Sequence, residues 1–322
     1  MPNPESTPPA DSIENVRKDK LGIFGPRAKL VPYTGVTGFM SVADVRAVAA
    51  DAYTASGFDT PTRGGRKLAI GVLASWKTLN GEPPGQPGRY PKLEDIRAVI
   101  DAAAETYHHR AVWQPEGEGA SFDLKTRCLR MIHYSSKEPN LSAQIDRLCE
   151  IAGPNLDGFQ LNMTWPREDE IRALAQARPT LRLILQINSR MYSGVSRSPQ
   201  LLATEVAKKY SPWVTDVLFD MSGGFGLSAD LAEAEYALEA LYTTLGGADA
   251  GGISIGVAGG LCWQSVVGLK RLFDRWPDLS IDAEGRLRDK TTDALNREMA
   301  REYVRRAAGV MPHRTPKTET TP

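Results

Sequence analysis

Residues 252–261 read Gly-Ile-Ser-Ile-Gly-Val-Ala-Gly-Gly-Leu, an apolar run that stops at a pair of glycines. Residues 214–226 read Val-Thr-Asp-Val-Leu-Phe-Asp-Met-Ser-Gly-Gly-Phe-Gly, an apolar run that ends in a carboxylate before its glycines. Short apolar runs of this kind are typical of parallel strands that are covered on both faces. Each stretch therefore predicts a buried strand, followed by a loop whose glycines let the backbone approach a ligand closely.

The same plan recurs along the chain, and helical patterns separate its repeats. Leu141, Ile145, Leu148 and Ala152 share one face of a helix. Proline, serine and asparagine mark helix starts near residues 41, 140 and 199. The predicted strands are residues 28–33, 67–74, 128–134, 156–162, 181–188, 214–220, 252–257 and 279–282.

Alternating strands and helices form either an open doubly wound sheet or a closed barrel. An open dinucleotide-binding sheet needs G-x-G-x-x-G after its first strand, and residues 34–38 read Thr-Gly-Val-Thr-Gly instead. Eight units favour a (β/α)8 TIM barrel, an α/β fold with a closed parallel sheet of eight strands. We expect the barrel to span residues 21–310, between disordered tails at 1–20 and 311–322, with insertions at 54–66 and 108–126.

The composition excludes several functional classes. The 322 residues include 39 basic and 39 acidic side chains, which gives no general argument for binding nucleic acid. No apolar stretch approaches the roughly 20 residues of a membrane helix. Cys128, Cys149 and Cys262 lie far apart and suit free thiols in a reducing cytoplasm. No metal or cofactor motif is present, so we expect a small-molecule substrate and no cofactor, and the oligomeric state stays open between a monomer and a homo-oligomer.

Three titratable residues are the candidate acids and bases. Asp220 ends the sixth predicted strand, and carboxyl ends of barrel strands face the active site; its alternative role is to cap a loop. His133 ends the third strand, where it is either a general base or a structural histidine. Asp282 ends the eighth strand and is another possible base.

Amides and glycines are the candidate ligand contacts. Gln160 and Asn162 close the fourth strand and Gln186 and Asn188 the fifth, and because side chains two residues apart share a face, each pair points to one side of the sheet. The candidate phosphate-binding residues follow strands six to eight, and the loop after strand seven is expected to lead directly into a helix N-terminus. Arg286 and Arg288 either hold an anion or pair with Asp282, Glu284 or Asp289. The phosphate candidates are Gly223, Gly224, Gly259, Gly260, Gly285 and Arg286.

Six short segments, in order, resemble the phosphoribosylanthranilate isomerase family of ribulose-phosphate-binding barrels, over about residues 30–308. Residues 33–37 (YTGVT) resemble the family's first strand I-C-G-I-T, and residues 88–91 (GRYP) its S-P-R-Y segment. Residues 258–261 (AGGL) match its A-G-G-L. The other three segments are FQLN at 159–162, LFD with Gly223 and Gly224, and Gly285 with Asp289.

The resemblance implies roles for individual residues. It makes Asp220 the general acid, Arg89 the clamp on a substrate carboxylate, and Gly259, Gly260 and Gly285 phosphate contacts. Thr34 stands where the family has its catalytic cysteine, so we expect it to contact the substrate. It is not expected to be the base, because an unactivated hydroxyl has too high a pKa to replace a thiolate. Asn162 replaces a family histidine, and Glu284 replaces a serine beside the phosphate.

Three functions are consistent with these residues. The first is an isomerase-like enzyme with altered chemistry on a small phosphorylated or carboxylated sugar, with Asp220 as acid or base and Arg89, Gln186 and Asn188 as ligand contacts. The second is a non-catalytic binding or regulatory barrel. The third is a true phosphoribosylanthranilate isomerase whose base has moved to His133 or Asp282.

Overall fold

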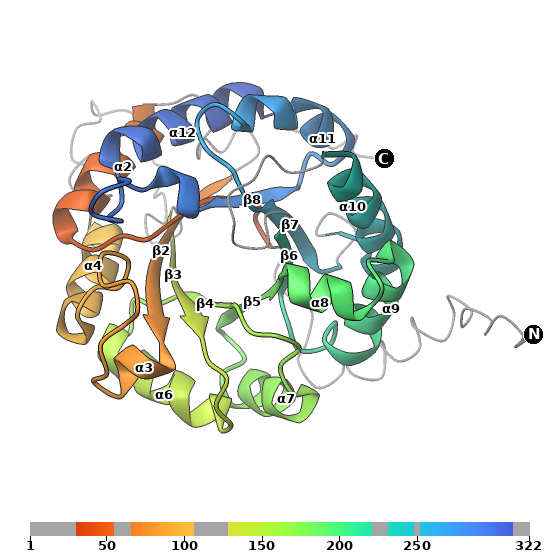
Figure 1. Cartoon of the computed structure of the whole chain (residues 1–322), viewed down its shortest axis with the longest axis horizontal. Helices are drawn as coiled ribbons and strands as arrows, with labels where there is room; N and C mark the ends of the chain where they lie inside the picture. The colour runs from red at the N-terminus through yellow and green to blue at the C-terminus, as the bar shows by residue number, and fades with distance from the viewer. Residues whose placement is uncertain (1–29, 55–65, 106–127, 221–230, 248–251, 312–322) are drawn as a thin grey trace, which may run out of the picture.

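Eight parallel strands close into a barrel in the computed structural model, which describes residues 30–54, 66–105, 128–220, 231–247 and 252–311. Neighbours in sequence are neighbours in the sheet, and the eighth strand pairs with the first. Figure 1 looks down the barrel, with the helices in a ring outside the strands. The predicted TIM barrel is confirmed. The strands are β1 Tyr33–Thr37, β2 Lys67–Ser75, β3 Cys128–Ser135, β4 Gly158–Leu161, β5 Arg182–Ile187, β6 Asp216–Asp220, β7 Ser254–Ala258 and β8 Ser280–Ala283.

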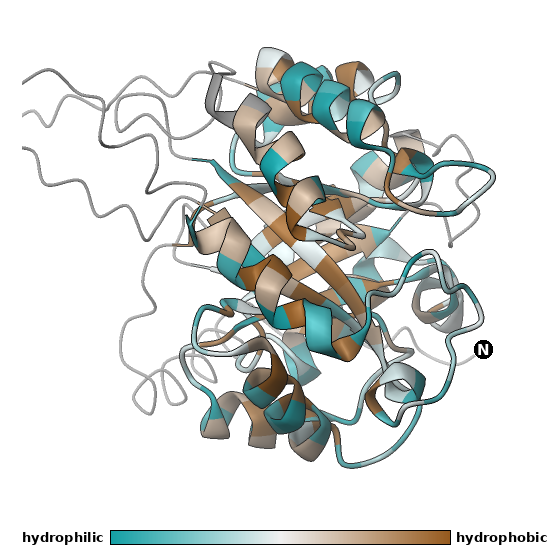
Figure 2. Ribbon diagram, turned by 90° about the vertical axis from the view of Figure 1, so that its left-hand side faces the viewer, coloured by the Kyte–Doolittle hydropathy of each residue, from teal (hydrophilic) through white to brown (hydrophobic). Residues whose placement is uncertain are grey.

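The outer ring covers the strands with amphipathic helices, whose apolar faces form one continuous core with the outward-facing strand residues. Figure 2 shows the hydrophobic strands enclosed by helices of mixed polarity. The α-helices are α2 Val42–Thr54, α3 Trp76–Leu79, α4 Leu93–Glu105, α6 Leu141–Ala152, α7 Glu168–Ala177, α8 Ser189–Gly194, α9 Pro199–Lys209, α10 Leu231–Leu245, α11 Lys270–Arg275 and α12 Arg297–Val310, and two 3-10 helices are η3 Val266–Leu269 and η4 Gly285–Leu287.

A second, smaller apolar cluster fills the inside of the barrel below the polar ends of the strands. Inward-facing side chains from six strands form it, and they close the barrel as a packed core rather than a pore. It comprises Tyr33, Ala69, Leu129, Met131, Ile184, Leu218 and Ala258.

The first predicted strand, 28–33, is displaced in the structure, where β1 covers Tyr33–Thr37. Tyr33 lies in the inner cluster and Val36 in the outer core, so alternation points Gly35 and Thr37 inward and Thr34 outward. Met311, which the sequence assigned to the C-terminal tail, is buried against this strand. The insertions at 54–66 and 108–126 lie almost entirely outside the described residues.

Candidate functional site

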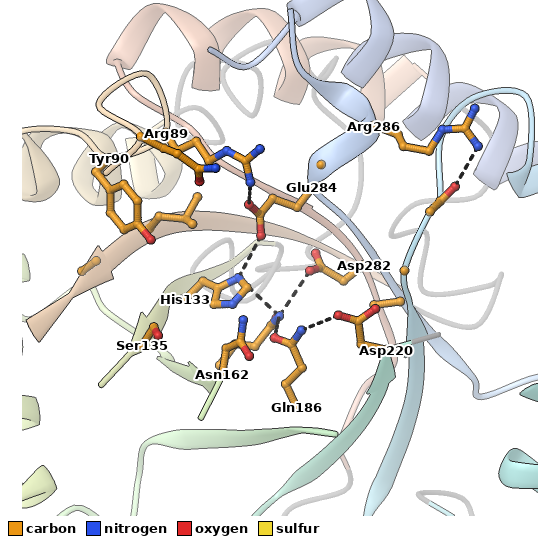
Figure 3. A pocket seen from close by; sticks show the side chains of 18 residues that line it. Arg89, Tyr90, His133, Ser135, Asn162, Gln186, Asp220, Asp282, Glu284 and Arg286 are labelled. Carbon is orange, nitrogen blue, oxygen red and sulfur yellow. Dashed lines mark hydrogen bonds and ion pairs between the residues drawn. The ribbon is translucent and has the colours of Figure 1, made fainter. Parts of the chain in front are cut away.

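A cavity of about 220 Å³ opens at the carboxyl end of the barrel, and most of the predicted site residues line it. Inward-facing residues at the ends of the strands make its floor, and the loops that follow the strands make its wall (Figure 3). The predicted residues in its lining are Arg89, His133, Gln160, Asn162, Gln186, Asp220, Gly259, Gly260, Asp282, Gly285 and Arg286. Polar groups thus converge where barrel enzymes hold their substrates.

Two carboxylates occupy opposite sides of one small residue in this cavity. Ala258 of β7 pairs with Asp220 on β6 and with Asp282 on β8, so all three lie at one level of the sheet. Two strand spacings of ~4.8 Å separate the backbones of the two aspartates by about 10 Å. Because Ala258 projects only a methyl group, the space between the carboxylates is open to a ligand.

Asp282 is almost completely buried, with 4% of its surface exposed. The Thr37 hydroxyl donates to its oxygens at 3.2 and 3.3 Å, and Gln160 Nε2 donates to Oδ2 at 3.4 Å. Burial, together with the negative charge of Glu284, raises the pKa of Asp282 to about 7. The carboxyl group can therefore both take up and release a proton near neutral pH.

Strand β1 makes room for this carboxyl group. A Cβ atom on Gly35 would lie 2.2 Å from Asp282 Oδ1, so a larger residue would displace the carboxylate. Gly35 pairs with Asp282 in the β1–β8 register. The acid of β8 thus lies over the backbone of β1.

Two glutamines connect the carboxylates. Gln160 Nε2 donates to Gln186 Oε1 at 3.0 Å, and Gln186 Nε2 donates to Asp220 Oδ2 at 2.9 Å. Since Gln160 also contacts Asp282, an unbroken chain of amide hydrogen bonds runs from one carboxylate to the other. This chain fixes the orientation of both acids, as catalysis requires of its proton donors and acceptors.

His133 projects into the cavity as a neutral imidazole. Burial lowers its pKa, and this effect outweighs the raising influence of Glu284 and Asp220. Its Nδ1 lies 3.4 Å from Glu284 Oε2 and 3.5 Å from Gln160 Nε2. Gln160 has two amide protons and closer acceptors in Gln186 and Asp282, so Nδ1 is best satisfied by donating to Glu284.

Glu284, which the sequence did not single out as a site residue, is the centre of a charged cluster. Its carboxylate lies 3.6 Å from Arg89 Nη1 and 3.3 Å from Arg288 Nη2, besides its contact with His133. Arg89 also bonds Asp293 at 2.6 Å. The predicted carboxylate clamp is therefore already held by two carboxylates of the protein.

Arg286 lies at another part of the rim, beside the two glycines that follow β7. Gly259 and Gly260 have φ values of 95° and 65°, which suit glycine. Arg286 Nη1 contacts the Gly260 carbonyl oxygen at 3.4 Å. The expectation of a helix directly after these glycines is wrong, because the next helical turn begins only at Val266.

Two predicted residues lie outside the cavity lining, and two more fall outside the described residues. Thr34 is fully buried, and its hydroxyl faces the Met311 sulfur at 3.7 Å, away from the cavity lining. Asn188 caps α8 by accepting from two backbone amides, and reaches the site only through Asn162 at 3.4 Å. Gly223 and Gly224 are outside the described residues.

Within the described ranges, no group of three or more His, Cys, Asp or Glu side chains is arranged to hold a metal ion. In the same part of the chain, no helix is both long and apolar enough to cross a membrane.

Solved structures with this fold include several enzymes. A phosphoribosyl anthranilate isomerase from Thermus thermophilus superposes with a TM-score of 0.52 at 17% identity, over 86% of this chain and 99% of that one. The ribulose-1,5-bisphosphate carboxylase/oxygenase of Pyrococcus horikoshii OT3 gives 0.53 at 12% identity, over 95% and 67%. A Rubisco-like protein from Rhodopseudomonas palustris gives 0.52 at 13% identity, over 96% and 74%. No protein-family model and no curated protein sequence matches the chain. At such identities these likenesses show the barrel fold.

Proposed function

We propose that this protein is a sugar-phosphate isomerase, an enzyme that moves a proton between adjacent carbons of a small phosphorylated substrate. The observation that carries the proposal is the pair Asp282 and Asp220, which face one cavity from either side of Ala258. Asp282 has a pKa of about 7, the range in which a carboxyl group works best as a general base and acid at neutral pH.

In the proposed reaction Asp282 removes a proton from the carbon next to a carbonyl or imine group, and an enediol or enolamine forms. Asp220 donates a proton to the carbonyl oxygen or imine nitrogen. Asp282 then returns its proton to the neighbouring carbon, and Asp220 recovers a proton from the substrate's hydroxyl group. Atoms and electrons balance within the substrate, so no oxidant or reductant is needed.

The remaining lining residues suit the rest of such a substrate. Gln160, Gln186 and Asn162 offer amide donors and acceptors to sugar hydroxyl groups. Arg286 with the backbone of Gly259, Gly260 and Gly285 would hold the phosphate. The resemblance to phosphoribosylanthranilate isomerase and the fold shared with that enzyme from Thermus thermophilus support this class of reaction. In this proposal the base is an aspartate of β8 rather than a residue at position 34.

Deuterium incorporation tests the proposal. Ribose 5-phosphate, ribulose 5-phosphate and phosphoribosylanthranilate are incubated with the protein in D2O, and carbon-bound deuterium is followed by NMR. We expect exchange with at least one of them, and loss of that exchange in Asp282→Asn and Asp220→Asn. Asp274→Asn, an exposed carboxylate on α11, is the matched control. Binding without exchange in the wild-type protein would favour the ligand-binding barrel instead.

A further inference from the structure

Glu284 makes one end of the cavity electrically different from the other. It follows β8 directly and lies two residues after Asp282, so both side chains point inward. Two guanidinium groups and one imidazole, from Arg89, Arg288 and His133, converge on its single carboxylate, and Figure 3 shows the contacts of Arg89 and His133. Without Glu284, these three groups would form a binding site for an anion.

The guanidinium groups at this end are already neutralised. Arg89 bonds both Glu284 and Asp293, while Arg288 bonds Glu284 and donates to the Asp293 carbonyl oxygen at 2.9 Å. The Arg288 side chain is only 2% exposed and cannot swing out to meet a ligand. A second anion entering here would meet the carboxylate of Glu284, which lines the cavity beside an Arg89 guanidinium that two carboxylates already hold.

The backbone holds this arrangement in place. Gly38 has a φ of 115°, and a Cβ atom there would lie 2.4 Å from Arg288 Nη2. The glycine therefore leaves the space in which the guanidinium of Arg288 packs. Because Arg288 is fixed in this space, Glu284 remains directed into the cavity.

The opposite end of the cavity has a cation with no such partner. Among the described residues, the only polar contact recorded for Arg286 is the Gly260 carbonyl oxygen, at 3.4 Å. Its positive charge is not opposed by a neighbouring carboxylate of the described chain. One anionic group therefore finds a complementary charge at Arg286, and a second one finds none at Glu284.

We propose that Glu284 is a specificity-determining residue, which restricts the site to sugars with one anionic group and accepts a hydrogen bond from a hydroxyl or amino group at the other end. This inference rests on the proposed function for the class of ligand, but not on turnover. It separates the substrate from carboxylated and doubly phosphorylated sugars, since like charges at contact distance repel strongly in a partly desolvated site.

The test compares two probes that differ by one phosphate, ribulose 5-phosphate and ribulose 1,5-bisphosphate, by isothermal titration calorimetry. The wild-type protein should bind the monophosphate at least tenfold more tightly. Glu284→Gln keeps the shape of the side chain and removes the negative charge that Arg89 and Arg288 share, so it should shift the ratio at least tenfold toward the bisphosphate. Glu302→Gln, which removes a carboxylate paired with Arg305 and Arg306 on α12, should leave the ratio unchanged.

Two results would overturn the inference: a wild-type preference for the bisphosphate or none at all, or an unchanged ratio in folded Glu284→Gln. The wild-type ratio decides by itself if the variant does not fold. Because the measurement is of binding, its outcome is independent of the deuterium experiment. A preference for the monophosphate without deuterium exchange would contradict the proposed function alone. Deuterium exchange without that preference would contradict the specificity role of Glu284 alone.

Discussion

Replacing Asp282 with asparagine should raise the free energy of unfolding above that of the wild type, and this difference should grow as the pH rises. A carboxyl group with an ordinary pKa of 3.8 and a folded-state pKa of about 7 binds its proton more tightly in the folded state. The unfolded chain therefore ionises first, and the folded state loses stability as the pH rises from about 4 to about 7. Above that range the difference of about three pKa units corresponds to roughly 4 kcal/mol, at 1.36 kcal/mol per unit.

Asparagine cannot ionise, so it removes this loss of stability, but it introduces a smaller loss of its own. It keeps one oxygen acceptor for the donors Thr37 and Gln160, so one hydrogen bond must rearrange, at about 1 kcal/mol. The free energy of unfolding of the variant should thus exceed that of the wild type by roughly 3 kcal/mol at pH 8. At pH 5 this difference should be smaller by about 2–3 kcal/mol.

Urea unfolding followed by tryptophan fluorescence at several pH values between 5 and 8 measures this gap. Asp274→Asn on the surface is the control and should show no pH-dependent gap. Parallel curves for the wild type and Asp282→Asn across that range would refute the reasoning, because they would mean that the Asp282 carboxyl ionises equally well in both states.

Three further substitutions distinguish residues that act in the reaction from residues that maintain the fold. Asp220→Asn should reduce isomerase turnover by at least ~10²-fold, the usual cost of losing a general acid or base, while unfolding midpoints barely change; normal turnover would remove Asp220 from the mechanism. Thr34→Cys should leave deuterium exchange unchanged because its side chain faces α12 and Met311 rather than the cavity, and a gain of activity would contradict this orientation. Gly35→Ala should lower turnover at least tenfold and cost about 1–3 kcal/mol of stability, since the added methyl overlaps Asp282; kinetics and urea unfolding together check this, and wild-type behaviour in both would show that the strand gives way.

The fold could be predicted because parallel strands buried on both faces leave continuous apolar runs in the sequence. The exception is β1, whose Thr34, Gly35 and Thr37 give a weak strand pattern. Gly35 is required there by the carboxylate of Asp282, a contact more than 240 residues away in the chain. Such a tertiary requirement leaves no local signal, and the predicted strand fell on the more apolar residues 28–33 instead.

The prediction at position 34 came from the family resemblance rather than from the strand pattern. Side chains alternate along a strand, so of two adjacent residues only one enters the barrel, and the sequence alone does not say which. Thr34 stands where the resembled family has its catalytic cysteine, and this made it a candidate substrate contact. In the actual strand Tyr33–Thr37 the inward positions beside it are Gly35 and Thr37, and Thr37 contacts Asp282.

Glu284 was missed for a different reason. Its segment, with Arg286, Arg288 and Asp289, reads as solvated surface charge, and an acidic residue is not expected beside a phosphate. Side chains two residues apart share a face, which placed Gln160 with Asn162 and equally places Glu284 with Asp282. This spacing was the sequence signal that could have identified Glu284 as a site residue. The partner Arg89 could not be found by spacing, because it comes from the loop before α4.

The two ends of the barrel interior differ in how they satisfy buried charge. At the amino end Arg182 pairs with Asp216 through two hydrogen bonds, stacks over the Tyr33 ring and donates to the Val31 carbonyl oxygen. At the carboxyl end the recorded hydrogen bonds of Asp282 come from a hydroxyl and an amide, with no cation among them. A buried carboxylate without a cation retains its proton to higher pH. The paired charge serves the scaffold, and the unpaired carboxyl, kept open to the cavity by Gly35 and Ala258, is the one that can exchange a proton with a ligand.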